Sequence, residues 1–193
     1  MIALITGGAR SGKSAFAERY AEHLAATGIY IATAQPFDGE MSQRIAHHQQ
    51  RRGMNSFRWH TIEEPLQLAE RMMELASSAE HDPNTVVLVD CLTLWLTNVI
   101  LQREHDADTE RQCEAEVEKL VSVLSTWRGR VLLVTNEVGQ GIVPPTPLGR
   151  LFRDISGRMN QRMASISDQV FLVTSGIPVE IKSSVSLAKL GGA

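Results

Sequence analysis

The sequence predicts an α/β fold, in which helices flank a mostly parallel twisted sheet that carries one antiparallel edge strand. Short apolar runs alternate with amphipathic segments along the chain, which is typical of a parallel sheet covered by helices. Several of these runs are almost continuously hydrophobic, as expected of strands that are buried on both faces. Near the end of the chain, one more short apolar run follows Gly176-Ile177-Pro178 closely, and this spacing suits a hairpin-like return.

The apolar runs place seven predicted strands along the chain. They cover residues 2–6, 29–33, 57–61, 85–90, 131–135, 169–173 and 179–182. The last of these is the predicted antiparallel edge strand.

Four helices are predicted between the strands, because apolar residues recur there at helical spacing. They cover residues 13–26, 64–77, 114–127 and 148–166. The third has the clearest apolar face, which is formed by Val117, Leu120, Val121, Leu124 and Trp127. Charges of alternating sign over residues 106–118 indicate a solvated helix face. A further helical stretch is expected over residues 38–52, directly after the second strand.

Length and composition favour one soluble, cytoplasmic domain over residues 1–182, followed by a flexible tail over residues 183–193. Of the 193 residues, 43% are hydrophobic and 21% are charged, which is ordinary for a globular protein. The formal charge of −3 offers no basic field for nucleic acid. No apolar run approaches the roughly 20 residues that a membrane helix needs, and no signal peptide is visible. Cys91 and Cys113 have neither metal-ligand spacing nor a disulfide framework, and Cys91 is interpreted as a buried small hydrophobe.

A phosphate-binding loop (P-loop) follows the first predicted strand and opens the first predicted helix. The pattern G-x-x-x-x-G-K-[S/T] is matched by Gly7, Gly8, Ala9, Arg10, Ser11, Gly12, Lys13 and Ser14. Glycines let such a loop point its backbone N–H groups at phosphate oxygens, and the helix start adds its positive dipole end. In this motif Lys13 contacts the β- and γ-phosphates, and Ser14 offers a hydroxyl to Mg²⁺. The loop and the order of elements therefore predict a RecA-like P-loop NTPase fold that binds a nucleoside triphosphate with Mg²⁺.

Asp90 is the candidate acidic partner of this loop. It follows four apolar residues at the carboxyl end of a predicted strand, where ligands collect in parallel sheets. A carboxylate in this place holds the water shell of Mg²⁺ in many P-loop enzymes. The alternative is that Asp90 caps the helix that follows, and the two roles are compatible.

The sequence argues against a regulatory GTPase. Such a protein carries an Asn-Lys-x-Asp motif after a late strand, whereas strand 131–135 is followed here by Asn136-Glu137-Val138-Gly139. Residues 136–141 are interpreted either as a loop on the substrate side of the sheet or as a plain polar connection.

A cationic helical stretch begins just after the second strand and therefore close to the mouth of the P-loop. It contains Arg44, His47, His48, Arg51 and Arg52. Two adjacent histidines point about 100° apart on a helix, which disfavours a shared metal ion. A neutral imidazole beside a triphosphate can act as a general base or as a nucleophile toward phosphorus. A solvated helix face is the competing interpretation, and the residues alone leave both open.

Several further short sequence motifs follow one another between residues 2 and 182. They are Ile5-Thr6 before the P-loop, Tyr30-Ile31-Ala32-Thr33, Arg44-Ile45-Ala46-His47-His48, Trp59-His60-Thr61-Ile62-Glu63, Asp90-Cys91-Leu92-Thr93 with Thr97-Asn98, Thr135-Asn136-Glu137-Val138-Gly139, Phe152-Arg153-Asp154-Ile155-Ser156-Gly157-Arg158-Met159-Asn160-Gln161 and Ser175-Gly176-Ile177-Pro178. Together with the P-loop, this set closely resembles the bifunctional adenosylcobinamide kinase / adenosylcobinamide-phosphate guanylyltransferase family of cobalamin assembly.

The resemblance implies two reactions on one domain. In the first, the γ-phosphate of ATP or GTP is transferred to the aminopropanol hydroxyl of adenosylcobinamide. In the second, a histidine that corresponds to His47 attacks the α-phosphate of GTP, and the GMP it holds passes to the phosphorylated cobinamide to give adenosylcobinamide-GDP. The family pattern also implies nucleotide contacts at Ala32, Thr33, Ala34, His48, Glu63 and Asp90, and a homo-oligomer that is often a trimer.

Two rival functions stay open at this point. One is a P-loop small-molecule kinase without a covalent nucleotidyl intermediate, which would leave the two histidines without a role. The other is a nucleotide-dependent binding module, which would bind nucleotide tightly but transfer nothing.

Overall fold

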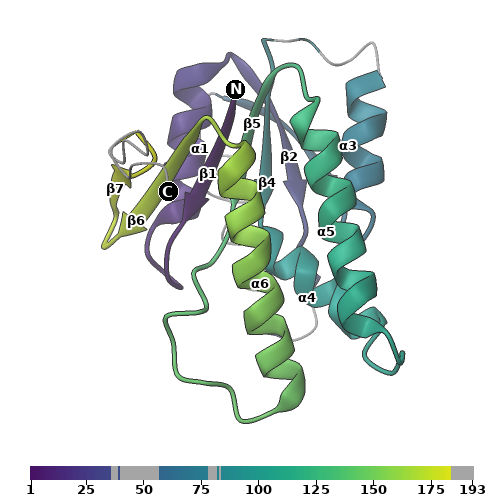
Figure 1. Ribbon diagram of the computed structural model, residues 1–193. Coiled ribbons are helices and arrows are strands. Elements are labelled where there is room, and N and C mark those ends of the chain that lie inside the picture. Colours follow the sequence, from purple (N-terminus) through teal and green to yellow (C-terminus); the bar gives the residue numbers. More distant parts are fainter. Residues whose placement is uncertain (36–38, 40–56, 78–81, 83, 184–193) are drawn as a thin grey trace, which may run out of the picture.

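The computed structural model describes residues 1–35, 39, 57–77, 82 and 84–183. Within these residues, seven strands form one sheet in the order β3-β2-β4-β5-β1-β6-β7 (Figure 1). The strands are β1 (Ile2–Thr6), β2 (Thr27–Ala32), β3 (Arg58–Glu63), β4 (Val86–Asp90), β5 (Arg130–Val134), β6 (Gln169–Thr174) and β7 (Ile177–Glu180). All neighbours pair in parallel except β6 and β7, which are antiparallel. The predicted fold class, a mostly parallel sheet with one antiparallel edge strand, is confirmed.

In the described part of the chain, helices cover both faces of the sheet, with α1 on one side and α3 to α6 on the other (Figure 1). They are α1 (Lys13–Leu24), α3 (Leu68–Ser77), α4 (Leu92–Gln102), α5 (Thr109–Ser125) and α6 (Pro147–Ile166). The side chains of β1 show why its sequence is continuously apolar. Leu4 packs into the core under α3 to α6, whereas Ile5 packs against the core under α1.

The predicted hairpin-like return is confirmed at the turn between β6 and β7. Its two central residues, Ser175 and Gly176, have φ values of 52° and 81°. Positive φ at both positions is the geometry of the tight hairpin turns that match strand twist. The edge strand therefore starts at Ile177, two residues before the predicted segment 179–182, and it includes Pro178. Proline is tolerated there because an edge strand has one side without a ladder partner.

Three helix predictions needed correction. The helix α4 was not among the four predicted helices, because its sequence is apolar almost all round and shows no amphipathic stripe; Leu92, Trp95 and Leu96 are fully buried. Helix α5 runs from Thr109 to Ser125, so it joins the predicted helix 114–127 to most of the charged helix face that was predicted over residues 106–118. Helix α3 begins at Leu68, four residues later than predicted, because the Glu64 carboxylate accepts the backbone N–H groups of Leu66 and Gln67 in a preceding turn.

Two predictions fall outside the described residues. The helical stretch over residues 38–52, which contains His47 and His48, lies there except for residue 39, and so does the tail from residue 184 onward. In the described part of the chain, no helix has both the length and the apolar character needed to cross a bilayer.

Candidate active site

The candidate site lies at the edge of the sheet where the parallel strands end. Strands β1 to β6 all point the same way, so the segments that follow them emerge together at the lower edge in Figure 1. The carboxyl edge of a parallel sheet is the usual place for a ligand in α/β folds. Apart from the histidine stretch, the site residues predicted from the sequence come from these segments.

The P-loop connects β1 to α1 in a tightly curled conformation. Gly7 and Gly12 have φ values of 157° and 93°, and Arg10 also lies in the left-handed region with φ 57°. A Cβ atom on Gly7 would lie 2.4 Å from the carbonyl oxygen of Val173 in β6, so only glycine fits there. The loop is also tied to the β6–β7 turn, because the backbone N–H of Gly176 donates to the carbonyl oxygen of Ser11 at 2.8 Å.

Lys13 is held over this loop. It is the first residue of α1, its side chain is buried at 8% exposure, and its ammonium donates to the carbonyl oxygen of Gly8 at 3.0 Å. Gly8, Ala9 and Arg10 are exposed at the outer rim. A buried cation, a curled backbone and a helix N-terminus therefore meet at one exposed loop, which is the combination that binds phosphate.

Three of the predicted nucleotide contacts are in register at the carboxyl ends of neighbouring strands: Ala32, Glu63 and Asp90. Ala32 at the end of β2 is in register with Glu63 of β3 on one side and with Asp90 of β4 on the other. Strand pairing thus places these three residues side by side in space, although they are far apart in the sequence. Glu63 is exposed, and Asp90 is half-buried.

The Asp90 carboxylate is oriented by a tyrosine. The hydroxyl of Tyr30, a buried residue of β2, donates to Asp90 Oδ2 at 2.9 Å. The alternative that Asp90 caps the next helix is not what the structure shows, because the N-cap of α4 is Cys91 and no side-chain capping hydrogen bond is made there. The described contact of the Asp90 carboxylate is therefore with the neighbouring strand β2 and not with the start of α4.

Thr33 links the segments that follow β2 and β4. Its hydroxyl donates to the carbonyl oxygen of Cys91 at 2.7 Å and accepts the Cys91 N–H at 2.8 Å. The side-chain amide of Asn98 in α4 donates to the carbonyl oxygen of Thr33 at 2.8 Å and to that of Pro65 at 3.0 Å. Thr33 is fully buried, so its side chain fixes the backbone on which Ala32 and Ala34 sit.

Cys91 is a structural residue in this arrangement. Burial, reinforced by the negative charge of Asp90, raises the pKa of the Cys91 thiol to about 11. The thiol is therefore protonated at neutral pH and is no nucleophile. This agrees with the interpretation of Cys91 as a buried small residue.

The sequence offered residues 136–141, after β5, as a substrate-side loop or a plain polar connection, but it predicted no individual site residue there. β5 lies between β1 and β4, so the residues after it fall between the P-loop and Asp90. Asn136 donates its side-chain amide to the Thr93 hydroxyl at 2.9 Å, and Glu137 donates its backbone N–H to the carbonyl oxygen of Gly7 at 3.2 Å. The signal in the sequence was the polar run after an apolar strand, but strand order is needed to place it beside the P-loop.

A metal ion that enters with a nucleotide does not require a cluster of protein ligands. Within the described ranges, no cluster of three or more histidine, cysteine, aspartate or glutamate side chains is placed to bind a metal. Mg²⁺ bound with a nucleotide needs only one or two protein ligands, since phosphates and waters complete its shell. The Ser14 hydroxyl at the start of α1 and the half-buried Asp90 carboxylate are oxygen ligands of the kind that Mg²⁺ prefers.

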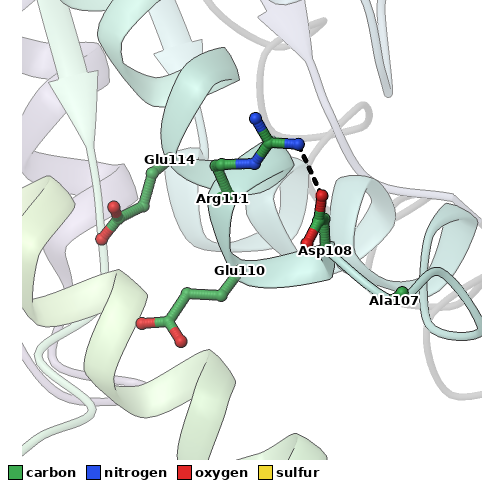
Figure 2. A pocket seen from close by; sticks show the side chains of 5 residues that line it. All are labelled: Ala107, Asp108, Glu110, Arg111 and Glu114. Carbon is green, nitrogen blue, oxygen red and sulfur yellow. Dashed lines mark hydrogen bonds and ion pairs between the residues drawn. The ribbon is translucent and has the colours of Figure 1, made fainter.

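A pocket at the start of α5 is unrelated to this site. Figure 2 shows its lining residues, which are Ala107, Asp108, Glu110, Arg111 and Glu114. Arg111 pairs with Asp108, while Glu110 and Glu114 each lie 2.6 Å from Arg158 of α6. None of the predicted site residues lines this pocket, and its charged side chains form ion pairs within the start of α5 or between α5 and α6.

Comparison with known proteins gives one consistent family. The model of the family described as cobinamide kinase / cobinamide phosphate guanyltransferase matches residues 3–181. The bifunctional adenosylcobalamin biosynthesis protein CobU of Escherichia coli is 42% identical over 94% of this chain and 100% of its own length. CobP of Pseudomonas aeruginosa, which carries the same description, is 42% identical over 93% of this chain and 96% of its own. Among solved structures, a KaiC-like protein from Pyrococcus horikoshii aligns with 89% of this chain and 69% of its own at a TM-score of 0.47 and 14% identity.

Proposed function

The chain belongs to the cobinamide kinase / cobinamide phosphate guanyltransferase family, and on this premise we propose that it is a bifunctional transferase that acts on adenosylcobinamide. It phosphorylates adenosylcobinamide with ATP or GTP, and it then transfers GMP from GTP to the product to give adenosylcobinamide-GDP. The observation that carries the proposal is the curled P-loop with Lys13 held over it, in a chain that matches the family across residues 3–181.

The P-loop serves as the triphosphate site for both reactions. Its backbone and the start of α1 bind phosphate oxygens, while Lys13 neutralises the charge that moves onto the leaving phosphates. Mg²⁺ bound between the phosphates, Ser14 and the Asp90 carboxylate would supply electrostatic stabilisation of that charge. The register of Ala32 with Glu63 and Asp90 supports a nucleotide that lies along the ends of β3, β2 and β4, with Thr33, Ala34 and His48 as further contacts.

His47 is the proposed covalent nucleophile of the second reaction. Its imidazole attacks the α-phosphate of GTP, pyrophosphate leaves, and the phosphoramidate holds GMP until the cobinamide phosphate takes it. Two steps let one nucleotide site serve two bulky partners in turn. The support is the family match and the position of His47 as the first histidine of the Arg44-Ile45-Ala46-His47-His48 run.

The proposal is tested by looking for the covalent intermediate. The protein is incubated with Mg²⁺ and GTP labelled at the α-phosphate, denatured, and washed in alkali or in mild acid. Label that survives alkali and is lost in acid is expected, because phosphoramidates have this stability. A parallel assay follows transfer of γ-labelled phosphate from ATP or GTP to adenosylcobinamide. Phosphate transfer without any retained label would leave a small-molecule kinase, and nucleotide binding without either would leave a binding module.

A Tyr30→Phe variant is expected to need more Mg²⁺. The change removes the hydrogen bond to Asp90 Oδ2 but keeps the ring, which packs edge-on against Trp59. Loss of a partner that orients a metal-binding carboxylate typically costs about 10- to 100-fold in metal affinity or activity. We expect a shift toward the lower end of that range in the Mg²⁺ concentration for half-maximal phosphorylation.

Tyr20 provides a matched control for this variant. Its hydroxyl donates to Gln169 Oε1 at 2.6 Å. Gln169 is the first residue of β6, so this bond lies at the amino-terminal ends of the strands, away from the candidate site. Tyr20→Phe should therefore leave the Mg²⁺ dependence unchanged. Equal shifts in both variants would mean that loss of stability, rather than the orientation of Asp90, causes the effect.

A further inference from the structure

Glu137 lies against the first residue of the P-loop. It follows β5, the strand that pairs with β1, and its backbone N–H donates to the carbonyl oxygen of Gly7 at 3.2 Å. Its carboxylate accepts the Thr6 hydroxyl through Oε2 at 3.3 Å. Thr6 is buried at 6% exposure, whereas Glu137 is half-buried. Backbone and side chain thus fix this carboxylate at the start of the phosphate site.

The other carboxylates described along this edge are placed for other tasks. Asp90 is bonded to Tyr30 and is separated from β1 by the whole of β5. Glu63 ends β3, which lies beyond β2 and β4, and Glu64 accepts two backbone N–H groups in the turn before α3. Glu137 is therefore better placed than these three to reach a group that approaches the outer phosphate from the β5–α6 side.

The first reaction requires a group of this kind, whereas the second does not. A hydroxyl that attacks phosphorus must lose its proton, and a positioned carboxylate can take it. A neutral imidazole attacks through a nitrogen that carries no proton, and a cobinamide phosphate attacks through an oxygen that is already ionised. The attacking atom itself therefore carries a proton in the phosphorylation step only.

We propose that Glu137 is the general base of the phosphorylation step, an inference that rests on the proposed function. The acceptor hydroxyl oxygen forms a bond to the γ-phosphorus while its proton passes to the Glu137 carboxylate. The bond between the γ-phosphorus and the bridging oxygen breaks, and its electron pair leaves with the nucleoside diphosphate. The proton is released to water after the product departs. Thr6 acts as a positioning residue that holds one oxygen of the Glu137 carboxylate.

The decisive experiment measures both half-reactions in a Glu137→Gln variant. Glutamine keeps the shape and the backbone bond to Gly7 but cannot accept the proton. We expect kcat for phosphorylation of adenosylcobinamide to fall by about 100-fold or more, with little change in the KM for nucleotide. The rate of covalent labelling by α-labelled GTP should stay within a factor of about two or three. Thr6→Val should lower the phosphorylation kcat to a smaller extent.

Two controls separate this role from a structural one. Glu118→Gln makes the same change of charge on the exposed face of α5, where Glu118 pairs with Arg162, and should leave both rates unchanged. Glu137→Ala with added formate should recover part of the lost phosphorylation rate, because the small carboxylate can occupy the place of the missing side chain.

Three results would overturn the inference, and a fourth concerns its premise. Phosphorylation near the wild-type rate in Glu137→Gln would show that the carboxylate is not the base. An equal loss of nucleotide affinity, labelling and phosphorylation would show that Glu137 only supports the P-loop. Failure of formate to rescue a folded Glu137→Ala variant would also count against a proton-transfer role. Absence of phosphorylation in the wild-type protein would instead defeat the proposed function itself.

Discussion

A Lys13→Met variant is expected to lose both activities together. Lys13 is the first residue of α1, and its ammonium bonds to the carbonyl oxygen of Gly8, so it spans the loop that we propose binds the triphosphate. Methionine retains the length and the apolar stem but removes the charge. Removing one preorganised group that stabilises developing charge costs about 100- to 1,000-fold in rate. We expect losses of this order in kcat/KM for phosphorylation and in the rate of covalent labelling by GTP.

A matched variant keeps this result interpretable. Lys119→Met removes an exposed lysine of α5 that pairs with Glu70 of α3, and it should change neither rate by more than a factor of about two. Thermal unfolding of both variants is compared with that of the wild type to check that the fold survives. If Lys13→Met lost phosphorylation but kept covalent labelling, the two reactions would use different triphosphate sites, and the shared P-loop would be wrong.

The P-loop could be predicted from the sequence because its requirements are local. A strand, a glycine-rich turn, a lysine and a helix start follow one another within residues 2–24, and the structure has this order. The same holds for the β6–β7 turn, where a glycine is followed by an isoleucine and a proline in an edge strand. In both places short-range backbone constraints decide the conformation, and the residue types indicate those constraints directly.

Glu137 and α4 could not be predicted in the same way, for two different physical reasons. The role of Glu137 depends on the insertion of β5 between β4 and β1, which is a property of strand order and leaves no periodic signal in the chain. Helix α4 is buried among the strands and the helices α5 and α6, so an apolar residue is favoured on nearly every side of it. A helix needs a polar face to be recognised by periodicity, and α4 lacks one.

The cluster of Ala32, Glu63 and Asp90 is an intermediate case. The sequence indicates that each residue ends a strand, and parallel strands end at a common edge. It does not indicate which strands are neighbours, so the registers of Ala32 with Glu63 and with Asp90 are new information from the structure. The same is true of Tyr30, whose bond to Asp90 joins adjacent strands across 60 positions of sequence.

A His47→Asn variant is expected to lose the covalent intermediate completely while it keeps the kinase reaction. Asparagine is polar and of similar bulk, but it offers no nucleophilic ring nitrogen, so no phosphoramidate can form. Transfer of GMP to cobinamide phosphate should fall below detection, whereas phosphorylation of adenosylcobinamide should stay within a factor of about two. The measurements are acid-labile label on the protein, formation of adenosylcobinamide-GDP, and transfer of the γ-phosphate.

Two other histidines test whether this loss is specific to His47. His48→Asn probes the neighbouring imidazole, which we propose contacts nucleotide, and it should weaken labelling without abolishing it. His105→Asn changes a histidine that is 92% exposed between α4 and α5, and it should leave labelling unchanged. A nucleophile differs from a binding group in this respect: its removal deletes the reaction path, whereas removal of a contact only slows it. Complete loss in His48→Asn with labelling retained in His47→Asn would move the covalent bond to the second histidine, and labelling retained in both would exclude this pair as the nucleophile.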